Sequence, residues 1–153
     1  MSAEFKIEGM EQFQRKIEKL ANPKKAKSIA RKAARQAMNI VRDAARSNAK
    51  AIDDTETSEM IQKNIAVQGG KTSNSNEIRI RVGVRGGASR NQHSVSTSGL
   101  SGGDTRHWRY VEFGTSKAPA TPFMRIAFFN NLDAVSNKFV QVFSAEIDKE
   151  LAL

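Results

Sequence analysis

Residues 22–50 have the sequence NPKKAKSIARKAARQAMNIVRDAARSNAK, and this stretch decides the fold. It combines a helix start with a two-sided pattern that lasts for about eight turns at 3.6 residues per turn. Asn22 can cap the free backbone N–H groups of a first turn, and Pro23 has no N–H to lose and a φ suited to a helix. The pattern predicts one long amphipathic helix.

One face of this predicted helix is apolar and built mainly from alanine. Its members recur three or four residues apart and are Ala26, Ile29, Ala30, Ala33, Ala37, Ile40, Val41 and Ala44. The face is expected to turn polar at Ser47 and Asn48. Because small side chains let neighbouring elements approach closely, we expect other elements to pack against this helix.

The opposite face of the same helix carries a basic stripe. Five cations fall within a narrow sector at about 100° per residue: Lys24, Arg31, Arg35, Arg42 and Arg46. Such a stripe is either a solvated polar face or a surface that meets DNA phosphates or an acidic protein partner. The sequence leaves these alternatives open.

Length and composition indicate a single domain, over residues 1–153, with a strongly basic first third. The net charge is +9, and residues 1–50 hold 13 Lys/Arg against 5 Asp/Glu. Such a field attracts nucleic acid or acidic surfaces. There are no cysteines, which excludes disulfides and thiolate metal sites. With no secretory leader pattern and no long apolar run, we expect neither a secreted precursor nor a membrane protein.

A small sheet is predicted after the long helix. Residues 64–68 and 77–84 form a strand pair, and in the second strand Ile78, Ile80, Val82 and Val84 alternate with polar residues or glycine. The connection between them is rich in turn formers, which favours an antiparallel hairpin. A short strand over residues 4–7 and a first helix over residues 10–21 are also expected.

The acidic segment between the long helix and the sheet could be interpreted as a binding site for a divalent cation. Its acids are Asp53, Asp54, Glu56 and Glu59. Calcium loops need a glycine turn, and no glycine lies between residues 10 and 68. We therefore predict no metal site. We expect instead a short helix over residues 59–63, capped by Thr57 or Ser58, with Met60 or Ile61 pointing inward.

Residues 86–106 contain five glycines and five serines but few apolar side chains. A connection of about twenty residues without its own structure is unusual inside a compact domain. We expect a flexible Gly/Ser-rich arm that becomes ordered on assembly.

Residues 107–129, HWRYVEFGTSKAPATPFMRIAFF, carry the most specific pattern. An aromatic, an apolar residue, Glu, an aromatic and Gly-Thr are followed by a loop and then by Pro-Phe-Met-Arg-x-Ala. The residues that we single out as its structural motif are Trp108, Tyr110, Glu112, Phe113, Gly114, Thr115, Pro119, Pro122, Phe123 and Arg125. The pattern closely resembles that of the tail-completion and neck proteins of long-tailed bacteriophages, the family that includes minor tail protein Z of phage lambda.

Physical reasons for this motif can be given from the residues alone. Gly114 can take a positive φ, and Thr115 can hydrogen-bond the turn that follows. Glu112 stands among aromatic and apolar residues, so burial would require a partner, for which Arg125 or Arg109 is the candidate. A catalytic role for Glu112 would need a second acid, a base or a metal, and the sequence offers none nearby.

The elements around the motif are predicted as helices. Residues 106–113 fit either a strand or a short helix, and we favour a helix capped by Asp104. A second long helix should begin at Pro122, with Thr121 as its cap, and continue through Leu151. Its bulky stripe should pack on the sheet or on the alanine face. The predicted fold is α+β, with a small antiparallel sheet packed by two long amphipathic helices and by short helices.

Enzyme functions are disfavoured by the inventory of side chains. The two histidines, His93 and His107, have no partners for a triad or an imidazole metal site, and the chain has no thiol. We expect no enzymatic activity and no cofactor.

The resemblance implies a structural virion protein of the phage neck. Such a protein would complete the tail end and help to join it to the DNA-filled head, as a homo-oligomeric ring expected to be six-fold. Its partners would be neighbouring tail and neck proteins and phage DNA in the lumen, with no membrane contact. Assembly would take place in the host cytoplasm. The alternative is a stand-alone nucleic-acid-binding protein that uses the basic stripe.

Overall fold

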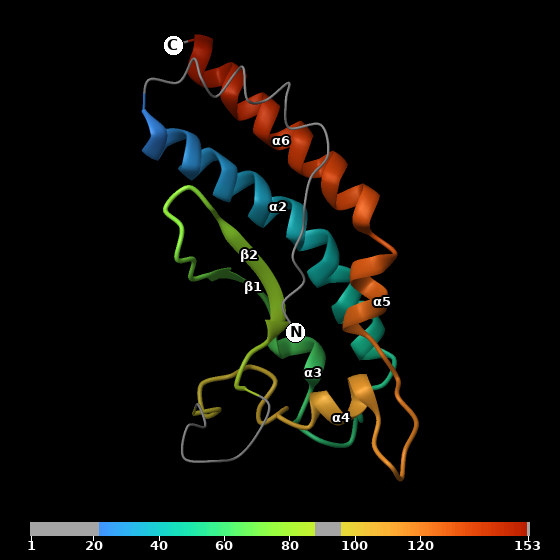
Figure 1. Cartoon of the computed structure of the whole chain (residues 1–153). Helices are drawn as coiled ribbons and strands as arrows, with labels where there is room; N and C mark the ends of the chain where they lie inside the picture. Colours follow the sequence, from blue (N-terminus) through green and yellow to red (C-terminus); the bar gives the residue numbers. More distant parts are fainter. Residues whose placement is uncertain (1–21, 88–95, 153) are drawn as a thin grey trace. The chain divides into compact units, whose positions relative to one another are not determined.

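The computed structural model describes residues 22–87 and 96–152 (Figure 1). Its elements are α2 (Pro23–Lys50), α3 (Ile61–Asn64), β1 (Ile65–Gly70), β2 (Arg79–Val84), α4 (Trp108–Phe113), α5 (Met124–Phe129) and α6 (Leu132–Ala152). The two strands pair in one antiparallel sheet. The predicted α+β class is confirmed, whereas the strand and helix expected within residues 4–21 lie outside the described residues.

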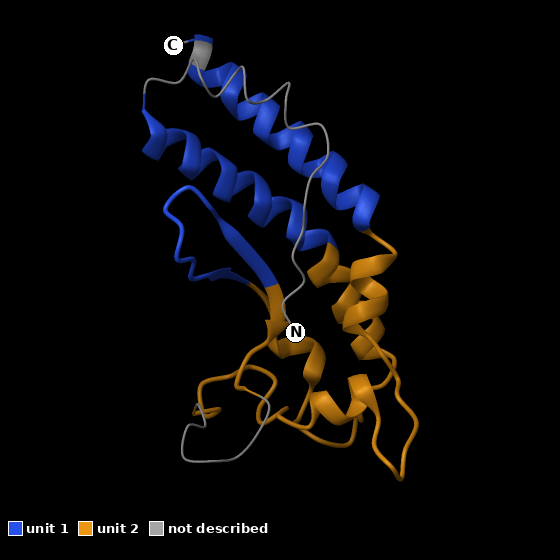
Figure 2. Cartoon of the chain, viewed as in Figure 1, with its two compact units in different colours: residues 1–40, 68–81, 132–153 blue, residues 41–67, 82–131 orange. Residues whose placement is uncertain are grey.

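The chain divides into two compact units, which are coloured separately in Figure 2. Unit 1 comprises residues 1–40, 68–81 and 132–153, and unit 2 comprises residues 41–67 and 82–131. The division falls within α2 and within both strands, so each unit combines segments that are distant in the sequence.

Helix α2 begins as the sequence predicts. The Asn22 side-chain oxygen accepts the backbone N–H of Lys24 at 3.0 Å, and the Asn22 carbonyl accepts the N–H of Ala26 at 3.3 Å. The cap satisfies donors that have no partner inside the first turn. The long predicted helix and its start are therefore confirmed.

The apolar face of α2 is longer than predicted and ends differently. Ala45 and Ala49 are fully buried, whereas Ala44, placed on the face by the sequence pattern, is only half-buried. The buried positions follow a spacing of four, which advances the buried side of the helix by about 40° at each step. The expected change to a polar face at Ser47 and Asn48 is therefore wrong, because the rotated face continues through alanine.

In unit 1, α6 lies alongside the first half of α2 (Figure 1). Val135, Phe139, Phe143 and Ile147 are buried at a regular spacing of four, and the rings of Phe139 and Phe143 stack with centroids 5.4 Å apart. Two ion pairs join the helices, Lys32 to Glu146 at 2.9 Å and Lys25 to Glu150 at 3.1 Å. The bulky stripe thus packs against the alanine face, one of the two positions expected.

The second long helix is interrupted, contrary to the prediction of one helix from Pro122 through Leu151. Helix α5 ends at Phe129, and α6 begins at Leu132. Between them, the Asn131 amide donates to the carbonyl of Ala127 at 2.7 Å. An asparagine that satisfies a terminal carbonyl competes with continuation of the helix, which explains the break.

The strands match the predicted hairpin with small shifts of their ends. Along β2, Val82 is buried and Ile80 is half-buried, while Arg79 and Arg81 are exposed. This alternation is the predicted period of two. In the connection, the Thr72 hydroxyl lies 3.0 Å from the carbonyl of Asn74 and 3.3 Å from that of Glu77, either of which can accept its proton, so a polar side chain of the turn helps to hold it.

Candidate functional site

Unit 2 contains a buried carboxylate, that of Glu112 on α4. Its side chain is 0% exposed and accepts the backbone N–H groups of Phe123 at 2.8 Å, Met124 at 2.9 Å and Arg125 at 3.0 Å. These donors belong to the start of α5, where N–H groups have no partner within the helix. Glu112 therefore caps α5 from another element, which local sequence rules do not anticipate.

Arg125 completes this junction. Its Nε donates to Glu112 Oε1 at 3.0 Å, its Nη2 donates to the Glu112 carbonyl at 2.6 Å, and its guanidinium lies 4.9 Å from the ring centroid of Phe113. Of the two arginines proposed as partners, Arg125 is the one that pairs with Glu112, while Arg109 is exposed. The predicted pairing of a buried glutamate with Arg125 is confirmed.

The ionised form of Glu112 is favoured in the folded chain. Burial on its own would raise the pKa of this carboxyl. Hydrogen bonds from the N–H groups of Met124, Arg125 and Phe123 and from the Arg125 side chain outweigh burial and lower the pKa below its ordinary value. The group therefore acts as a fixed anion that holds α4 and α5 together.

The loop between α4 and α5 is a compact turn. Gly114 has a φ of 75°, and the Thr115 hydroxyl accepts the N–H groups of Lys117 at 3.2 Å and Ala118 at 3.1 Å. Both roles were predicted. Pro119 is exposed and Pro122 is half-buried.

The predicted start of the last helix is wrong. The N-cap position of α5 is Phe123, with no side-chain cap of its own, and Thr121 instead donates its backbone N–H to the carbonyl of Val111 at 2.8 Å. Glu112 supplies the cap that Thr121 was expected to provide.

Large apolar side chains are exposed on the same two helices. Tyr110 is 62% and Phe113 47% exposed on α4, and Ile126 is 45% and Phe129 64% exposed on α5. These four residues are called the apolar set below. They are the large hydrophobic residues that the structure exposes within residues 22–87 and 96–152. On each helix the two exposed side chains are three residues apart, so they lie on the same side of that helix.

A second polar cluster in unit 2 holds the segment before α4. The buried Asn64 side chain donates to the carbonyl of Gly103 at 2.9 Å and to the Thr105 hydroxyl at 2.7 Å, and accepts the N–H of Gly102 at 2.9 Å. Trp108 Nε1 also donates to the carbonyl of Gly87 at 3.0 Å. Residues 86–106 were expected to be an arm ordered on assembly, but residues 102–105 are fixed by contacts within this chain. Residues 88–95 lie outside the described part.

Two capping assignments made from the sequence also change. The Asp53 carboxylate accepts the N–H groups of Ile61 at 2.9 Å and Gln62 at 3.0 Å, and so caps α3 in place of Thr57 or Ser58. Asp104 accepts the N–H of Arg106 at 3.3 Å and pairs with its guanidinium at 2.6 Å. It organises the turn before α4 rather than capping that helix, whose N-cap is His107. The short helix predicted within residues 106–113 is confirmed as α4.

Replacing Asn64 by leucine is expected to lower the free energy of unfolding by about 3 kcal/mol, because the buried Gly102 N–H, the buried Thr105 hydroxyl and the half-buried Gly103 carbonyl lose their hydrogen bonds. Urea unfolding measures this loss, and amide hydrogen exchange at residues 100–105 should accelerate in parallel. Asn137→Leu, at an exposed position on α6, is the matched control and should change little. Equal stability of the two variants would contradict the assigned role of Asn64.

The five residues of the predicted basic stripe have different surroundings. Lys24, Arg31 and Arg35 are exposed and belong to unit 1, whereas Arg42 and Arg46 are half-buried and belong to unit 2. Arg46 donates to the carbonyl of Ile65 from Nε at 3.0 Å and from Nη2 at 2.7 Å, while Arg42 Nε donates to Asp43 at 2.9 Å. Arg46 thus serves the start of β1, and only three of the five cations remain exposed.

The described residues offer neither a metal site nor a membrane span. Within residues 22–87 and 96–152, no group of three or more His, Cys, Asp or Glu side chains could hold a metal ion. In the same part of the chain, no helix is both long and apolar enough to cross a membrane.

Sequence reasoning missed several of these residues. Asn64 and Asp53 act across 38 to 41 and 8 to 9 residues of sequence, respectively, so no local pattern indicates their roles. Ile126 and Phe129 are not part of the apolar stripe that begins at Met124. Their position outside the stripe could have predicted that they are exposed.

The chain matches the model of the HK97-gp10_like family, described as "Bacteriophage HK97-gp10, putative tail-component", over residues 11–114. The match covers more than half of the chain and ends at Gly114. Searches of curated proteins and of solved structures found no match.

Proposed function

Since this chain belongs to the HK97-gp10-like family of bacteriophage tail components, we propose that it is a structural subunit of the phage neck. In this role it completes the tail end and helps to join the tail to the DNA-filled head. The family match carries the proposal. A tail component contacts other tail proteins, and the apolar set provides side chains suited to such contacts.

The Glu112 junction explains how these side chains are presented. Glu112 binds three N–H groups and the guanidinium of α5, so α4 and α5 are fixed before any partner arrives. A surface that is already ordered loses less conformational entropy on binding. Exposed aromatic residues on such a framework are the usual anchors of protein interfaces.

The proposed assembly is a ring of identical subunits, expected to have six-fold symmetry. Ring contacts are heterologous, since one patch of a subunit meets a different patch of the next until rotation closes the circle. In this proposal the ring forms in the host cytoplasm, becomes part of the virion and has no catalytic activity. The turn and helices around Glu112 serve as a scaffold.

The proposal is tested by mixing the purified chain with phage tail tubes and examining the tube ends by negative-stain microscopy. Symmetric rings or capped ends, with a matching oligomeric mass, are expected. A monomer that leaves tube ends bare at all concentrations would contradict the proposal.

A matched pair of variants tests the role of the apolar set. Phe129→Ser should reduce affinity for tube ends by about 10-fold or more if Phe129 is an anchor of the contact. Because Phe129 is 64% exposed, the melting temperature of the variant should differ little from that of the unchanged protein. Gln141→Ser, at an exposed position on α6, should bind as the unchanged protein does. Equal affinities of the two variants would remove Phe129 from the interface.

A further inference from the structure

Positive charge in unit 1 is concentrated on two segments. Residues 22–40 and 68–81, which hold the first half of α2 and most of the hairpin, contain nine Lys/Arg and one Asp/Glu. In contrast, α6 contains two Lys/Arg and four Asp/Glu. In the described part of unit 1, the excess of positive charge therefore lies on α2 and the hairpin, whereas α6 is acidic.

Three of these nine cations have acidic partners. Lys25 and Lys32 pair with α6, and Arg79 pairs with Glu77 at 3.3 Å. The other six have no ion pair with any residue of the described segments, and five of them are exposed, Lys27 being half-buried. We call these six the basic face: Lys24, Lys27, Arg31, Arg35, Lys71 and Arg81.

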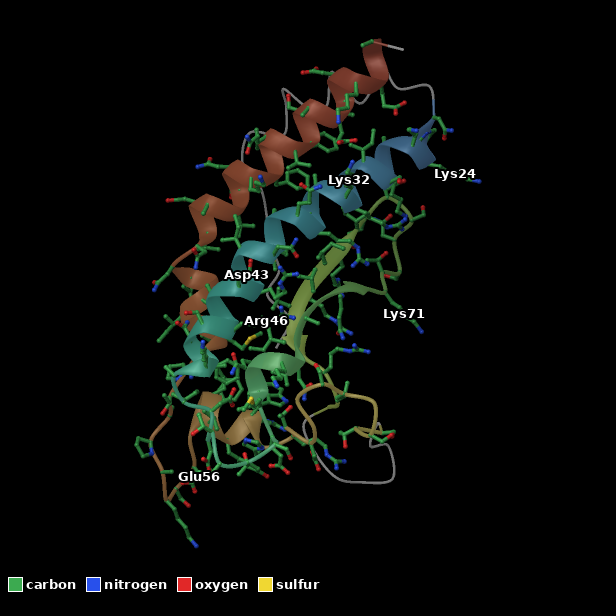
Figure 3. The ribbon with its side chains drawn as sticks, turned by 180° about the vertical axis from the view of Figure 1, so that it is seen from behind. Lys24, Lys32, Asp43, Arg46, Glu56 and Lys71 are labelled. Carbon is green, nitrogen blue, oxygen red and sulfur yellow. The ribbon has the colours of Figure 1, made fainter. Side chains whose placement is uncertain are left out.

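The hairpin and α2 present these cations from adjoining elements. The Lys27 ammonium donates to the carbonyl of Ser75 in the connection between the strands. The Arg35 guanidinium lies against Gly69 of β1, with Nη2 at 3.2 Å from the place where a Cβ would stand. In Figure 3, Lys32 points toward α6, whereas Lys24 and Lys71 point away from the ribbon. The basic face is thus a property of the folded unit and not of α2 alone.

The composition of this face favours a phosphate backbone over an acidic protein. Protein interfaces are anchored by aromatic and large apolar side chains, and within the described residues the exposed ones all belong to unit 2. Binding to phosphates needs only cations, which release condensed counterions from the nucleic acid. None of the known base-reading modules is present in the described segments, so sequence-independent contact is expected.

We propose that the basic face of unit 1 binds the phosphate backbone of double-stranded DNA without regard to sequence. The choice of double-stranded DNA rests on the proposed place of the chain between the tail and the DNA-filled head. The face differs from the stripe predicted on α2, because it excludes Arg42 and Arg46 and includes Lys27 and two hairpin residues, Lys71 and Arg81.

The test is binding of a short labelled DNA duplex to the full chain, measured by fluorescence anisotropy at several salt concentrations. The logarithm of the binding constant should fall linearly with the logarithm of salt concentration, with a slope of about −0.9 for each phosphate neutralised. The variant Arg31→Gln/Arg35→Gln/Lys71→Gln/Arg81→Gln should bind at least about 10-fold more weakly at low salt. With four cations removed, the magnitude of the slope should decrease by as much as about 3.6.

A control variant with the same net charge as the face variant separates the effect of the basic face from the effect of the net charge of the chain. It changes four exposed cations of unit 2, Lys50→Gln/Lys63→Gln/Arg109→Gln/Lys117→Gln. Both variants should melt close to the unchanged protein, and the control should keep most of its affinity and slope. Equal losses in the two variants, or no binding by the unchanged chain at low salt, would overturn the proposal.

Two further outcomes separate this inference from its alternatives. If a labelled poly-glutamate peptide binds as tightly as DNA and with the same dependence on the basic face, an acidic protein partner replaces DNA and the proposal is overturned. The face variant should still cap tail tubes. If the face variant loses DNA binding but still caps tubes, both proposals are supported. If the unchanged chain binds DNA through the basic face but never caps tubes, only the neck function is contradicted.

Discussion

Replacing Glu112 by glutamine is expected to lower the free energy of unfolding by about 3 kcal/mol at neutral pH. The carboxylate is fully buried and accepts three backbone N–H groups and the Arg125 guanidinium. A neutral amide offers one acceptor oxygen and places an NH₂ group against donors. Urea unfolding at pH 7 measures the loss, with Glu56→Gln at an exposed position as the control.

The pH dependence of this effect has a defined sign. The folded chain lowers the pKa of Glu112, so its stabilising contribution is present above the pKa of the unfolded chain, about 4.3 for a glutamate. It is lost as the pH falls through the lower folded value. The stability difference between the unchanged protein and Glu112→Gln should therefore be constant near neutral pH and shrink below about pH 4. A difference that grows on acidification would contradict this assignment.

Replacing Gly114 by valine is expected to lower the free energy of unfolding by about 4 kcal/mol or to prevent folding. Gly114 has a φ of 75°, which a β-branched residue resists, and a Cβ there would stand 2.7 Å from the nitrogen of Ala120. Thermal melting and tube capping together measure the effect.

Gly87→Val separates the two causes of this loss. Gly87 has a similar φ of 80°, but a Cβ there would meet nothing within 4 Å. Its substitution should therefore cost only the conformational part, about 1–3 kcal/mol. If Gly114→Val melts no lower than Gly87→Val, the turn between α4 and α5 tolerates a side chain and its tight packing is not required.

The parts of the fold that were predicted correctly depend on local chemistry. Helix α2 follows from its Asn22-Pro23 start and its apolar period, and β2 follows from the alternation around Val82. Gly114 and Thr115 were assigned their turn because glycine and threonine have specific local roles there. Such features are set by residues a few positions apart.

The parts that were missed depend on contacts between distant residues. The pairing of Glu112 with Arg125 followed from the need to neutralise a buried charge, but the cap on α5 required three N–H groups to converge on it. Asn64 and Asp53 act in the same way on other segments. The break between α5 and α6 escaped prediction because the apolar spacing continues across Asn130 and Asn131.

The candidate binding residues were predicted less completely than the fold. Helical period placed Lys24, Arg31 and Arg35 on an exposed side of α2 correctly. It could not show that Arg46 would bind the carbonyl of Ile65, because that carbonyl belongs to a strand 19 residues away. A charge on a helix face is available to a partner only if the fold leaves it unoccupied.

The proposed place of the chain in the virion is tested most directly by immunogold labelling of purified phage particles with antibodies raised against the chain. The account predicts gold at the end of the tail that meets the head, in tails that are detached from heads as well as in whole particles. Labelling confined to the far tip of the tail, or virions that contain none of the chain, would contradict it.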